Sequence, residues 1–318
     1  MIGSFCPPAD MERQARTAEV LRRAGEWLYS GALADLVRMF GGDPERSGDL
    51  GADAERIRAF AEEKWNYRQG RERWTVGNEM LGRDRERILR ACRELGLIGK
   101  TEPDREPDFV LPLGGFRATN RERPLMARET IDRYGWTGKT VAALSGMRPL
   151  DLDREGEALA AFAPDAGTEY GAISAGLEKA FGIRAYEETE YPSDTVNSRA
   201  AVRRYTESYR GNTVWSLAAP SLEPETRRAN SYDTFVYFLQ KFPVGRGSRL
   251  LMITNCVYVP YQMMKFMDLA LEGGFEVDGI GADYVLTPPD PNGLNANAYL
   301  QEVKGVIDAV AAFVARNA

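Results

Sequence analysis

Hydrophobic residues in the first hundred positions recur at mixed three- and four-residue spacings, which is the pattern of amphipathic helices. We predict helices over residues 11–40, 52–65 and 83–96, with a Gly-Gly-Asp break after the first of them. Few β-branched runs occur in this part of the chain. We therefore predict that residues 1–104 form a helical N-terminal subdomain. Its boundary falls within a charged, proline-bearing linker that extends over residues 101–108.

Beyond the linker, short apolar segments alternate with longer amphipathic ones. The short segments, predicted as buried strands, are residues 109–113, 140–144, 213–218, 249–254 and 275–280. The predicted helices are residues 120–134, 155–162, 170–181, 198–208, 230–242, 259–272 and 295–317. Strands that alternate with helices imply right-handed crossovers and a parallel sheet. We therefore predict that residues 105–318 form a Rossmann-like α/β domain, whose mostly parallel sheet is flanked by helices.

The predicted strands end in small or polar residues, as a ligand site at a sheet edge requires. In open parallel sheets, ligands bind outside the carboxyl ends of the strands, and these ends all lie at one edge. We therefore expect the residues at these ends to line a single site. They are Gly114-Gly115, Ser145-Gly146, Pro220-Ser221 and Thr254-Asn255.

The chain contains no histidine among its 318 residues, and this limits its chemistry more than any other feature of the composition. Histidine-based triads, histidine general bases and histidine metal ligands are all excluded. Acid–base chemistry has to come from Asp, Glu, Lys, Tyr or Cys, and the remaining metal chemistry is a carboxylate site for a hard cation. We predict no metal site, and a transferase or hydrolase activity would have to work without histidine.

Charge and cysteine content favour a cytoplasmic protein that does not bind nucleic acid through a general basic surface. The net charge of −6 argues against a nucleic-acid binder that works through a general basic field. Cys6, Cys92 and Cys256 lie far apart and form no disulfide framework, which suits a reducing compartment. No segment reaches 18 apolar residues, so no membrane span is predicted, and the N-terminus lacks a secretion pattern. The sequence leaves the oligomeric state undetermined.

The segment after the first predicted strand, residues 111–123, is the first candidate for ligand binding. Gly114 and Gly115 let the backbone approach a ligand closely, and the following helix start offers free N–H groups and a positive dipole end. Arg117 and Asn120 add donors that suit phosphate or carboxylate. The spacing matches neither the dinucleotide-binding nor the P-loop motif. The alternative is a tight turn followed by solvated arginines.

Two later loops also gather polar residues. Residues 187–199 contain Glu190 and Asp194 as candidate general bases, or they serve only to cap the predicted helix that follows. Residues 219–234 contain an arginine pair that could clamp an anion, or they form an exposed, charged helix start. The candidate ligand-binding residues in the two loops are Ser193, Thr195, Asn197, Ser221, Arg227 and Arg228.

The most regular strand ends at Thr254 and Asn255, and Tyr258 opens the helix behind it as a candidate hydrogen-bond donor. The methionine-rich stretch at residues 263–267 is predicted to be core. Cys256 is predicted to be structural, because a nucleophilic cysteine would have no histidine partner in this chain.

The order of these motifs resembles the DUF218 (SanA/YdcF/ElyC-like) family over roughly residues 108–285. That family has strands ending in Gly-Gly and Ser-Gly, a Glu-Ala helix start, an E-x-x-S-x-N-T-x-E-N loop and a strand leading to V-T-S-x-x-H-x-x-R-A. The segments VLPLGG, ALSG, TEYGAISAGLEKAFGI, EETEYPSDTVN and LLMITNCVYVPYQ stand in those places. The E-S-N-T element falls either at residues 190–197 or at 221–234. Tyr258 and Tyr261 occupy the positions of the family's His and Arg, so the family's chemistry would be altered or lost.

The resemblance implies a Rossmann-like fold and a nucleotide-like or adenosyl ligand such as S-adenosylmethionine. We expect an enzyme, its reaction unassigned, that acts on a small anionic or nucleotide-like ligand at the strand ends, with Glu190 or Asp194 as base and Tyr258 as donor. One alternative is a non-catalytic binding or regulatory protein on a degenerate scaffold. Another is that the N-terminal helices bind a partner while the α/β domain supports them.

Overall fold

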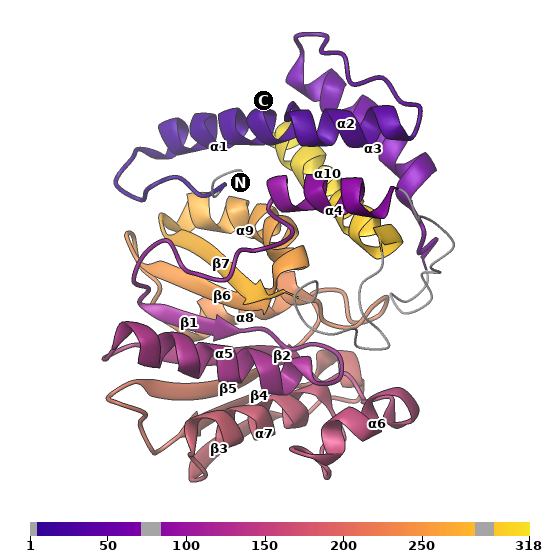
Figure 1. Cartoon of the computed structure of the whole chain (residues 1–318). Coiled ribbons are helices and arrows are strands. Elements are labelled where there is room, and N and C mark those ends of the chain that lie inside the picture. The colour runs from indigo at the N-terminus through magenta and orange to yellow at the C-terminus, as the bar shows by residue number, and fades with distance from the viewer. Residues whose placement is uncertain (1–4, 71–83, 284–295) are drawn as a thin grey trace. The chain divides into compact units, whose positions relative to one another are not determined.

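The computed structural model describes residues 5–70, 84–283 and 296–318 (Figure 1). Its contacts divide the chain into two compact units, one of residues 1–102 with 255–318 and one of residues 103–254. The predicted boundary after residue 104 lies two residues from the end of the first segment. The prediction placed residues 255–318 in the α/β domain, whereas in the structure they cluster with the N-terminal helices.

The unit of residues 1–102 and 255–318 is mainly helical. Its elements are α1 (Arg13–Leu28), α2 (Gly31–Met39), α3 (Leu50–Trp65), α4 (Arg85–Glu94), the short 3-10 turn Cys256–Tyr258, α9 (Val259–Gly273), β7 (Glu276–Ala282) and α10 (Ala296–Asn317). Helix α10 packs against α1, α3, α4 and α9, and most of its residues are buried. This packing joins the two ends of the chain. The sequence could not show it, because the hydrophobic period of residues 296–317 indicates an apolar face but not the helices that cover that face.

Residues 11–40 form two helices where the periodicity predicted one. Ser30 is the N-cap of α2, and its side-chain oxygen accepts a hydrogen bond from the Leu33 amide at 3.3 Å. A serine in this place satisfies an amide that has no partner within the helix, and so favours a new helix start. The chain turns at Tyr29 and Ser30, between the buried residues Leu28 and Leu33.

The unit of residues 103–254 is an α/β domain. Its elements are β1 (Phe109–Pro112), α5 (Thr119–Tyr134), β2 (Thr140–Gly146), α6 (Leu152–Ala160), α7 (Glu169–Phe181), β3 (Tyr186–Tyr191), the 3-10 turn Val196–Ser198, β4 (Ala200–Tyr205), β5 (Thr213–Ala219), α8 (Ser231–Lys241) and β6 (Arg249–Asn255). Within this unit the described strands form a sheet in the order β3-β4-β5-β2-β1-β6. Strands β5, β2, β1 and β6 are parallel neighbours, which confirms the predicted mostly parallel sheet.

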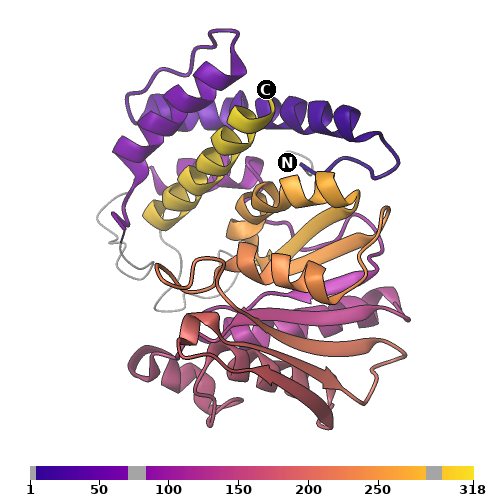
Figure 2. The same cartoon turned by 180° about the vertical axis from the view of Figure 1, so that it is seen from behind.

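Helices cover both faces of this sheet. Helices α5 and α7 lie on the face turned to the viewer in Figure 1, and α8 lies on the other face, which Figure 2 shows from behind. The central strands β1, β2, β5 and β6 are accordingly almost fully buried. No helix in the described ranges is long and apolar enough to cross a membrane.

The helix predicted over residues 198–208 is wrong, because residues 200–205 form β4. Alanine and arginine favour helix locally, but pairing with neighbouring strands overrides such preferences. Strand β4 runs antiparallel to both neighbours, with Ala201 opposite Ala218 of β5 and Glu190 of β3. Residues 187–191, predicted as loop, belong to the exposed edge strand β3.

Candidate functional site at the carboxyl ends of the parallel strands

The parallel strands end where the sequence predicted, within two residues in each case. Strands β1, β2, β5 and β6 end at Pro112, Gly146, Ala219 and Asn255. The strand order reverses at β1, since the chain moves from β1 to β2 on one side and later adds β6 on the other. Ligands of open α/β sheets bind outside the carboxyl ends of the strands at such a reversal. The residues around the end of β1 are therefore the centre of the candidate site.

The backbone at Gly114 lies closer to its neighbours than a Cβ atom normally comes. A Cβ atom there would be 2.9 Å from Ser145 Cβ and 3.2 Å from Glu169 Cδ, with a Glu169 carboxylate oxygen closer still. The Gly114 amide donates to Leu144 O at 2.6 Å, which fixes the strand end. The end of the Glu169 side chain can move aside, but Ser145 Cβ lies next to the backbone, so a larger residue at Gly114 would force the strand end or Ser145 to shift.

The Gly-Gly loop is held by side chains of the helix that follows it. Asn120, which is fully buried, accepts from the Gly115 amide and donates to the Gly115 carbonyl, both at 3.0 Å. Arg123 donates to the carbonyls of Leu113 and Gly114, both at 2.6 Å. Two of the predicted ligand residues thus bind each other: the Gly115 amide that we expected to face a ligand is bonded to Asn120.

Arg148 connects this loop to two carboxylates. Its Nε donates to Glu169 at 2.8 Å, and its two terminal nitrogens donate to Glu155 at 2.7 and 3.1 Å. The remaining donors contact the carbonyls of Gly115 at 3.1 Å and Pro149 at 3.3 Å. All five N–H groups of this guanidinium therefore have partners within the protein.

Glu155 is fully buried and its hydrogen bonds hold it ionised. The Arg117 and Asp151 amides donate to its two oxygens, each at 3.0 Å, in addition to the bonds from Arg148. Burial raises the pKa of this carboxyl, but the bonds from Arg148 and the two amides outweigh burial and hold the pKa below its ordinary value. Glu155 thus fixes the geometry of the site and has no oxygen left for a ligand.

Glu169 differs from Glu155 in keeping one oxygen available. Its Oε2 accepts from Arg148, whereas Oε1 faces Gly114 and receives no hydrogen bond within the described part of the chain. Its side chain is 16% exposed. Thr168 caps α7 and places Glu169 in the first helical turn, where the helix dipole stabilises a negative charge.

The sequence analysis did not select Arg148, Glu155 or Glu169. One signal was available, because a single arginine follows the strand end at Ser145-Gly146 and both glutamates lie in or next to predicted helix starts. Nothing in the sequence showed that Glu155 and Glu169 both bind Arg148 beside the Gly114-Gly115 loop, since these contacts depend on how α6 and α7 fold back over the sheet.

Glu190 lies on the same edge and the same face of the sheet as Gly114, but at the other end of it. The strand register places Glu190, Ala201, Ala218 and Ser145 in one row, with Gly114 next to Ser145. Four steps between neighbouring strands correspond to about 19 Å. Tyr170 and Met147 pack on the two alanines in the middle of the row. Glu190 is therefore out of reach of a small ligand bound at Gly114.

The loops after β3 and β5 bind each other through their backbones. The Ser221 amide donates to the Asn197 carbonyl at 2.7 Å, and the Asn197 side chain donates to the Pro224 carbonyl at 2.9 Å. The Ser193 carbonyl and the Thr195 hydroxyl form bonds within their own loop, and Asp194 is exposed. These residues gather at the predicted edge as parts of two mutually supporting loops.

The arginine pair expected to clamp an anion is partly used within the protein. Arg227 contacts the buried carboxylate of Asp233, with one distance of 3.1 Å, and also Glu223 at 3.0 Å and the Ser221 hydroxyl at 3.3 Å. The pKa of Arg227 is raised, first by its bond to Asp233. Arg228 is exposed. Arg117 has an uncommon positive φ of 57°, and its Nε donates to the Arg154 carbonyl at 2.8 Å.

The other residues predicted at the ends of β2 and β6 do not offer free polar groups at Gly114. Ser145 donates to the Leu217 carbonyl at 3.0 Å, and Gly146 faces Ala229. Thr254 follows Ile253, the partner of Pro112, so side-chain alternation points it to the face opposite Gly114, where its buried hydroxyl has no partner among the described residues. The division between the units falls at the last residue of β6, so that Asn255, which is buried, and Tyr258, which is half-buried, belong to the other unit.

Cys256, in the same unit as Tyr258, is buried as predicted for a structural cysteine. Its thiol contacts the carbonyls of Gly281 at 3.0 Å and Lys100 at 3.3 Å. Burial and the nearby Asp283 raise the pKa of this thiol to about 12. Across the described ranges, no three Cys, Asp or Glu side chains are grouped so that they could hold a metal ion.

Comparison with known proteins relates the helical part of the chain to one family model. A model described as the Rv3785 N-terminal domain matches residues 11–96. The relatives include "Uncharacterized protein Rv3785" and "Uncharacterized protein MT3893" of Mycobacterium tuberculosis and "Uncharacterized protein Mb3814" of Mycobacterium bovis. Each is 28% identical to this chain over 340 aligned positions, which cover 98% of this chain and 94% of the relative. No solved structure matches the chain.

The resemblance to the DUF218 family is wrong. The family model that matches is that of the Rv3785 N-terminal domain, the relatives carry other names, and no DUF218 model matches. The motifs that suggested the resemblance were small residues at strand ends, and those are common to parallel sheets that bind ligands there. The Rossmann-like architecture does not depend on the resemblance.

Proposed function

We propose that residues 103–254 bind a small nucleoside-like ligand at the carboxyl ends of β1 and β2, with Glu169 accepting hydrogen bonds from its ribose hydroxyls. The observation that carries this proposal is the Glu169 carboxylate, which Arg148 holds by one oxygen while the other faces Gly114 without a donor. A carboxylate beside the strand ends is also the group that receives ribose hydroxyls in dinucleotide-binding sheets.

The internal hydrogen bonds of the site narrow the chemistry of the ligand. The Gly114 and Gly115 amides, the Arg117 amide and the Arg148 guanidinium are all bonded within the protein. A phosphate at this point would have to displace one of these bonds, whereas a hydroxyl group needs only the acceptor that Glu169 supplies. The site therefore favours the sugar part of a nucleotide-like ligand over its anionic part.

We propose further that the chain is an enzyme and that Glu169 is its general base. A carboxylate fixed by an arginine and adjacent to the bound ligand can receive a proton from a ligand hydroxyl. One observation favours the alternative of a non-catalytic binding protein. Within hydrogen-bond reach of Gly114, the described residues include no second carboxylate or nucleophile that lacks an internal partner, since Ser145 and Glu155 are both bonded.

Binding of adenosine to the full chain, measured by calorimetry, tests the proposed site. Hydrogen bonds to a charged group contribute about 1.5–3 kcal/mol, so 2′,3′-dideoxyadenosine should bind roughly tenfold or more weakly than adenosine. Glu169→Gln should remove this difference between the two ligands. Glu157→Gln is the matched control, because Glu157 is exposed on the neighbouring α6 and makes no contact with the site.

Two results would contradict the proposal. The first is adenosine binding that is equally tight in Glu169→Gln and the parent, and the second is no binding to the parent at millimolar adenosine. Chromatography of the bound nucleoside after incubation separates the two functions. A product that forms with the parent and not with Glu169→Gln indicates the enzyme, and an unchanged ligand indicates the binding protein.

A further inference from the structure

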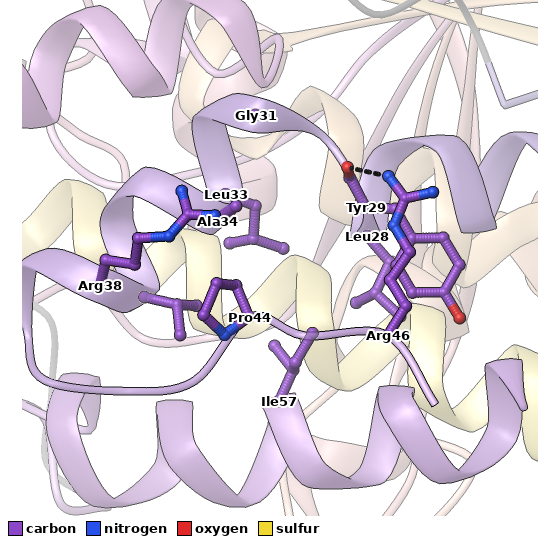
Figure 3. Close-up of a pocket in the computed structure, with 10 residues that line it drawn as sticks. Leu28, Tyr29, Gly31, Leu33, Ala34, Arg38, Pro44, Arg46 and Ile57 are labelled. Carbon is purple, nitrogen blue, oxygen red and sulfur yellow. Dashed lines mark hydrogen bonds between the residues drawn. The ribbon is translucent and has the colours of Figure 1, made fainter. Parts of the chain in front are cut away.

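The pocket within the N-terminal helices has few groups that could recognise a ligand (Figure 3). The leucine, valine and isoleucine side chains that line it are at most 3% exposed. Its two arginines stand on opposite sides in Figure 3 and already bind within the same helical unit, Arg38 to Asp35 and Arg46 to the Tyr29 carbonyl. The free edge of the sheet in the other unit does present groups that can bind a partner.

Strand β3 forms this edge (Figure 1). Its residues 186–191 are all exposed, run antiparallel to β4 and pair with no other described strand. Edge strands are usually kept from pairing with other chains by charged side chains, above all lysine, by proline or by a bulge. The segment YEETEY contains neither lysine nor proline, and its register with β4 has no bulge. Its charges are three glutamates, and their positions decide which strand can pair with it.

The backbone groups that β3 turns outward follow from this register. The Thr206 amide donates to the Ala185 carbonyl at 2.9 Å, so the carbonyl of Ala185 faces β4. Alternate residues of an antiparallel strand face the same neighbour. The N–H and C=O groups of Tyr186, Glu188 and Glu190 therefore face away from the sheet. No backbone partner for these groups lies in the described part of the chain.

We propose that two copies of this chain dimerise by antiparallel pairing of their β3 strands, about a two-fold axis at Glu188. Glu188 then lies opposite the partner's Glu188, and on either side Tyr186 lies opposite the partner's Glu190. Each of these pairs exchanges two backbone hydrogen bonds. The two sheets join into one, which removes the free edge of both.

The charges along β3 favour this register. Glu187 lies opposite the partner's Thr189, so neither Glu187 nor Glu190 faces a like charge. An axis at residue 187 would place the two Glu187 side chains opposite each other, and an axis at residue 189 would place Glu188 opposite the partner's Glu190. Like charges directly opposite each other are destabilising. An axis at residue 186 or 190 leaves at least half of β3 without a partner strand.

Each Glu188 brings its own positive partner to the axis. Its carboxylate accepts from the Tyr170 hydroxyl at 2.6 Å and from Arg203 Nε at 3.0 Å. Arg203 also lies 3.8 Å from the centre of the Tyr186 ring, and Lys241 lies 4.6 Å from that of Tyr191. These rings are 45% and 43% exposed, and a side chain fixed before association loses little entropy on binding.

Sedimentation equilibrium of the full chain measures the association. An interface of one strand pair is at the small end of the range, so we expect a dissociation constant of roughly 1–100 μM. Across that range the mean mass should rise from 35.4 kDa towards twice that value. A chain that stays at 35.4 kDa well above the range would overturn the proposal.

Glu190→Pro separates dimerisation from folding. The Glu190 amide faces away from β4, so proline removes a donor of the dimer and none of the sheet, and edge strands tolerate proline at such positions. The two-fold axis removes this bond twice, so association should weaken at least tenfold at an unchanged melting temperature. Glu190→Ala keeps the N–H group and should weaken association much less. A folded Glu190→Pro chain that dimerises like the parent would refute the pairing.

Glu188→Cys tests the register, because it places two thiols at the axis. Opposed residues that exchange hydrogen bonds have Cα atoms about 5.5 Å apart, within the span of a disulfide. Glu190→Cys is the matched control, since its two thiols would lie four residues apart along the paired strands, about 14 Å. Cys92 and Cys256 are buried and Cys6 half-buried, so the parent serves as the blank. On mild oxidation only Glu188→Cys should form a covalent dimer; equal crosslinking of both variants, or of neither, contradicts the proposed axis.

Discussion

Replacing Gly176 with alanine should destabilise the α/β unit, although alanine is the better helix former. Gly176 lies inside α7, where it faces the start of α5. A Cβ atom there would be 3.0 Å from the Asn120 carbonyl carbon and 3.3 Å from Arg121 Cα, with the Asn120 carbonyl oxygen closer still. Carbon atoms in contact prefer separations of about 3.5–4.0 Å. The two helices would therefore have to move apart by at least about half an ångström.

The size of the effect follows from two opposing contributions. Overpacking costs about 1–3 kcal/mol, and the upper end applies because the atoms in the way are backbone and cannot rotate aside. The helix propensity of alanine returns about 1 kcal/mol. The net loss should be about 2 kcal/mol in the free energy of unfolding, or about 4–8 °C in melting temperature for a unit of this size.

Gly156→Ala in α6 is the matched control for this measurement. A Cβ at Gly156 would meet only Leu152 Cβ, at 4.0 Å, so the same substitution inside a helix should stabilise by about 0.5–1 kcal/mol. Urea unfolding followed by circular dichroism gives both values. If Gly176→Ala unfolds at the same or a higher urea concentration than the parent, the close packing of α5 on α7 is not as described and the reasoning fails.

Three further predictions concern buried polar groups and thiols. Glu155→Gln should cost about 3–5 kcal/mol, because Glu155 is fully buried and the substitution leaves the half-buried Arg148 without one of its two carboxylates; unfolding in urea at pH 7 measures this loss. Since the pKa of Glu155 is lowered from 4.5, its stabilisation is complete above about that pH and is lost as the pH falls through the lower folded value; urea titrations from pH 6 to pH 3 should show a weaker acid dependence in the variant than in the parent. Arg16 is buried and donates to two backbone carbonyls, so Arg16→Met should lower the free energy of unfolding by about 2–4 kcal/mol, and an unchanged melting temperature would show that these bonds contribute nothing. Burial raises the thiol pKa of Cys92 and of Cys256, so neither should react with a disulfide reagent at pH 8 until the chain is unfolded, and rapid modification of the folded chain at either thiol would contradict their burial.

The sequence was most informative where one local pattern decides the structure. The apolar segments at residues 109–113 and 249–254 became β1 and β6 within one residue, because an apolar run bounded by breakers has few ways to be buried. It was least informative at residues 200–205, where Ala and Arg favour a helix and pairing with β3 and β5 makes a strand instead. No residue within that segment records the partners that decide it.

The candidate site shows the same division. Sequence indicated the Gly-Gly loop, because glycines at a strand end are a local signal, and in the structure a Cβ atom at Gly114 would lie 2.9 Å from Ser145 Cβ. The positions of the carboxylates relative to this loop could not be predicted from the sequence. Glu190 was selected because its segment is rich in polar residues, but the strand order places it about 19 Å from Gly114. Glu169 instead reaches Gly114 from the start of α7.

By itself, the sequence determined the classes of structure and chemistry that this protein can use. The periods of its apolar residues set helices and strands, and the lack of histidine removed whole families of mechanisms. Only the tertiary structure decided which charged side chains form ion pairs within the protein, as Arg148 and Arg227 do, and which keep an atom that can bind a ligand, as Glu169 does. The physical reason is that a side chain's availability depends on neighbours brought from distant parts of the chain, and local spacing carries no record of them.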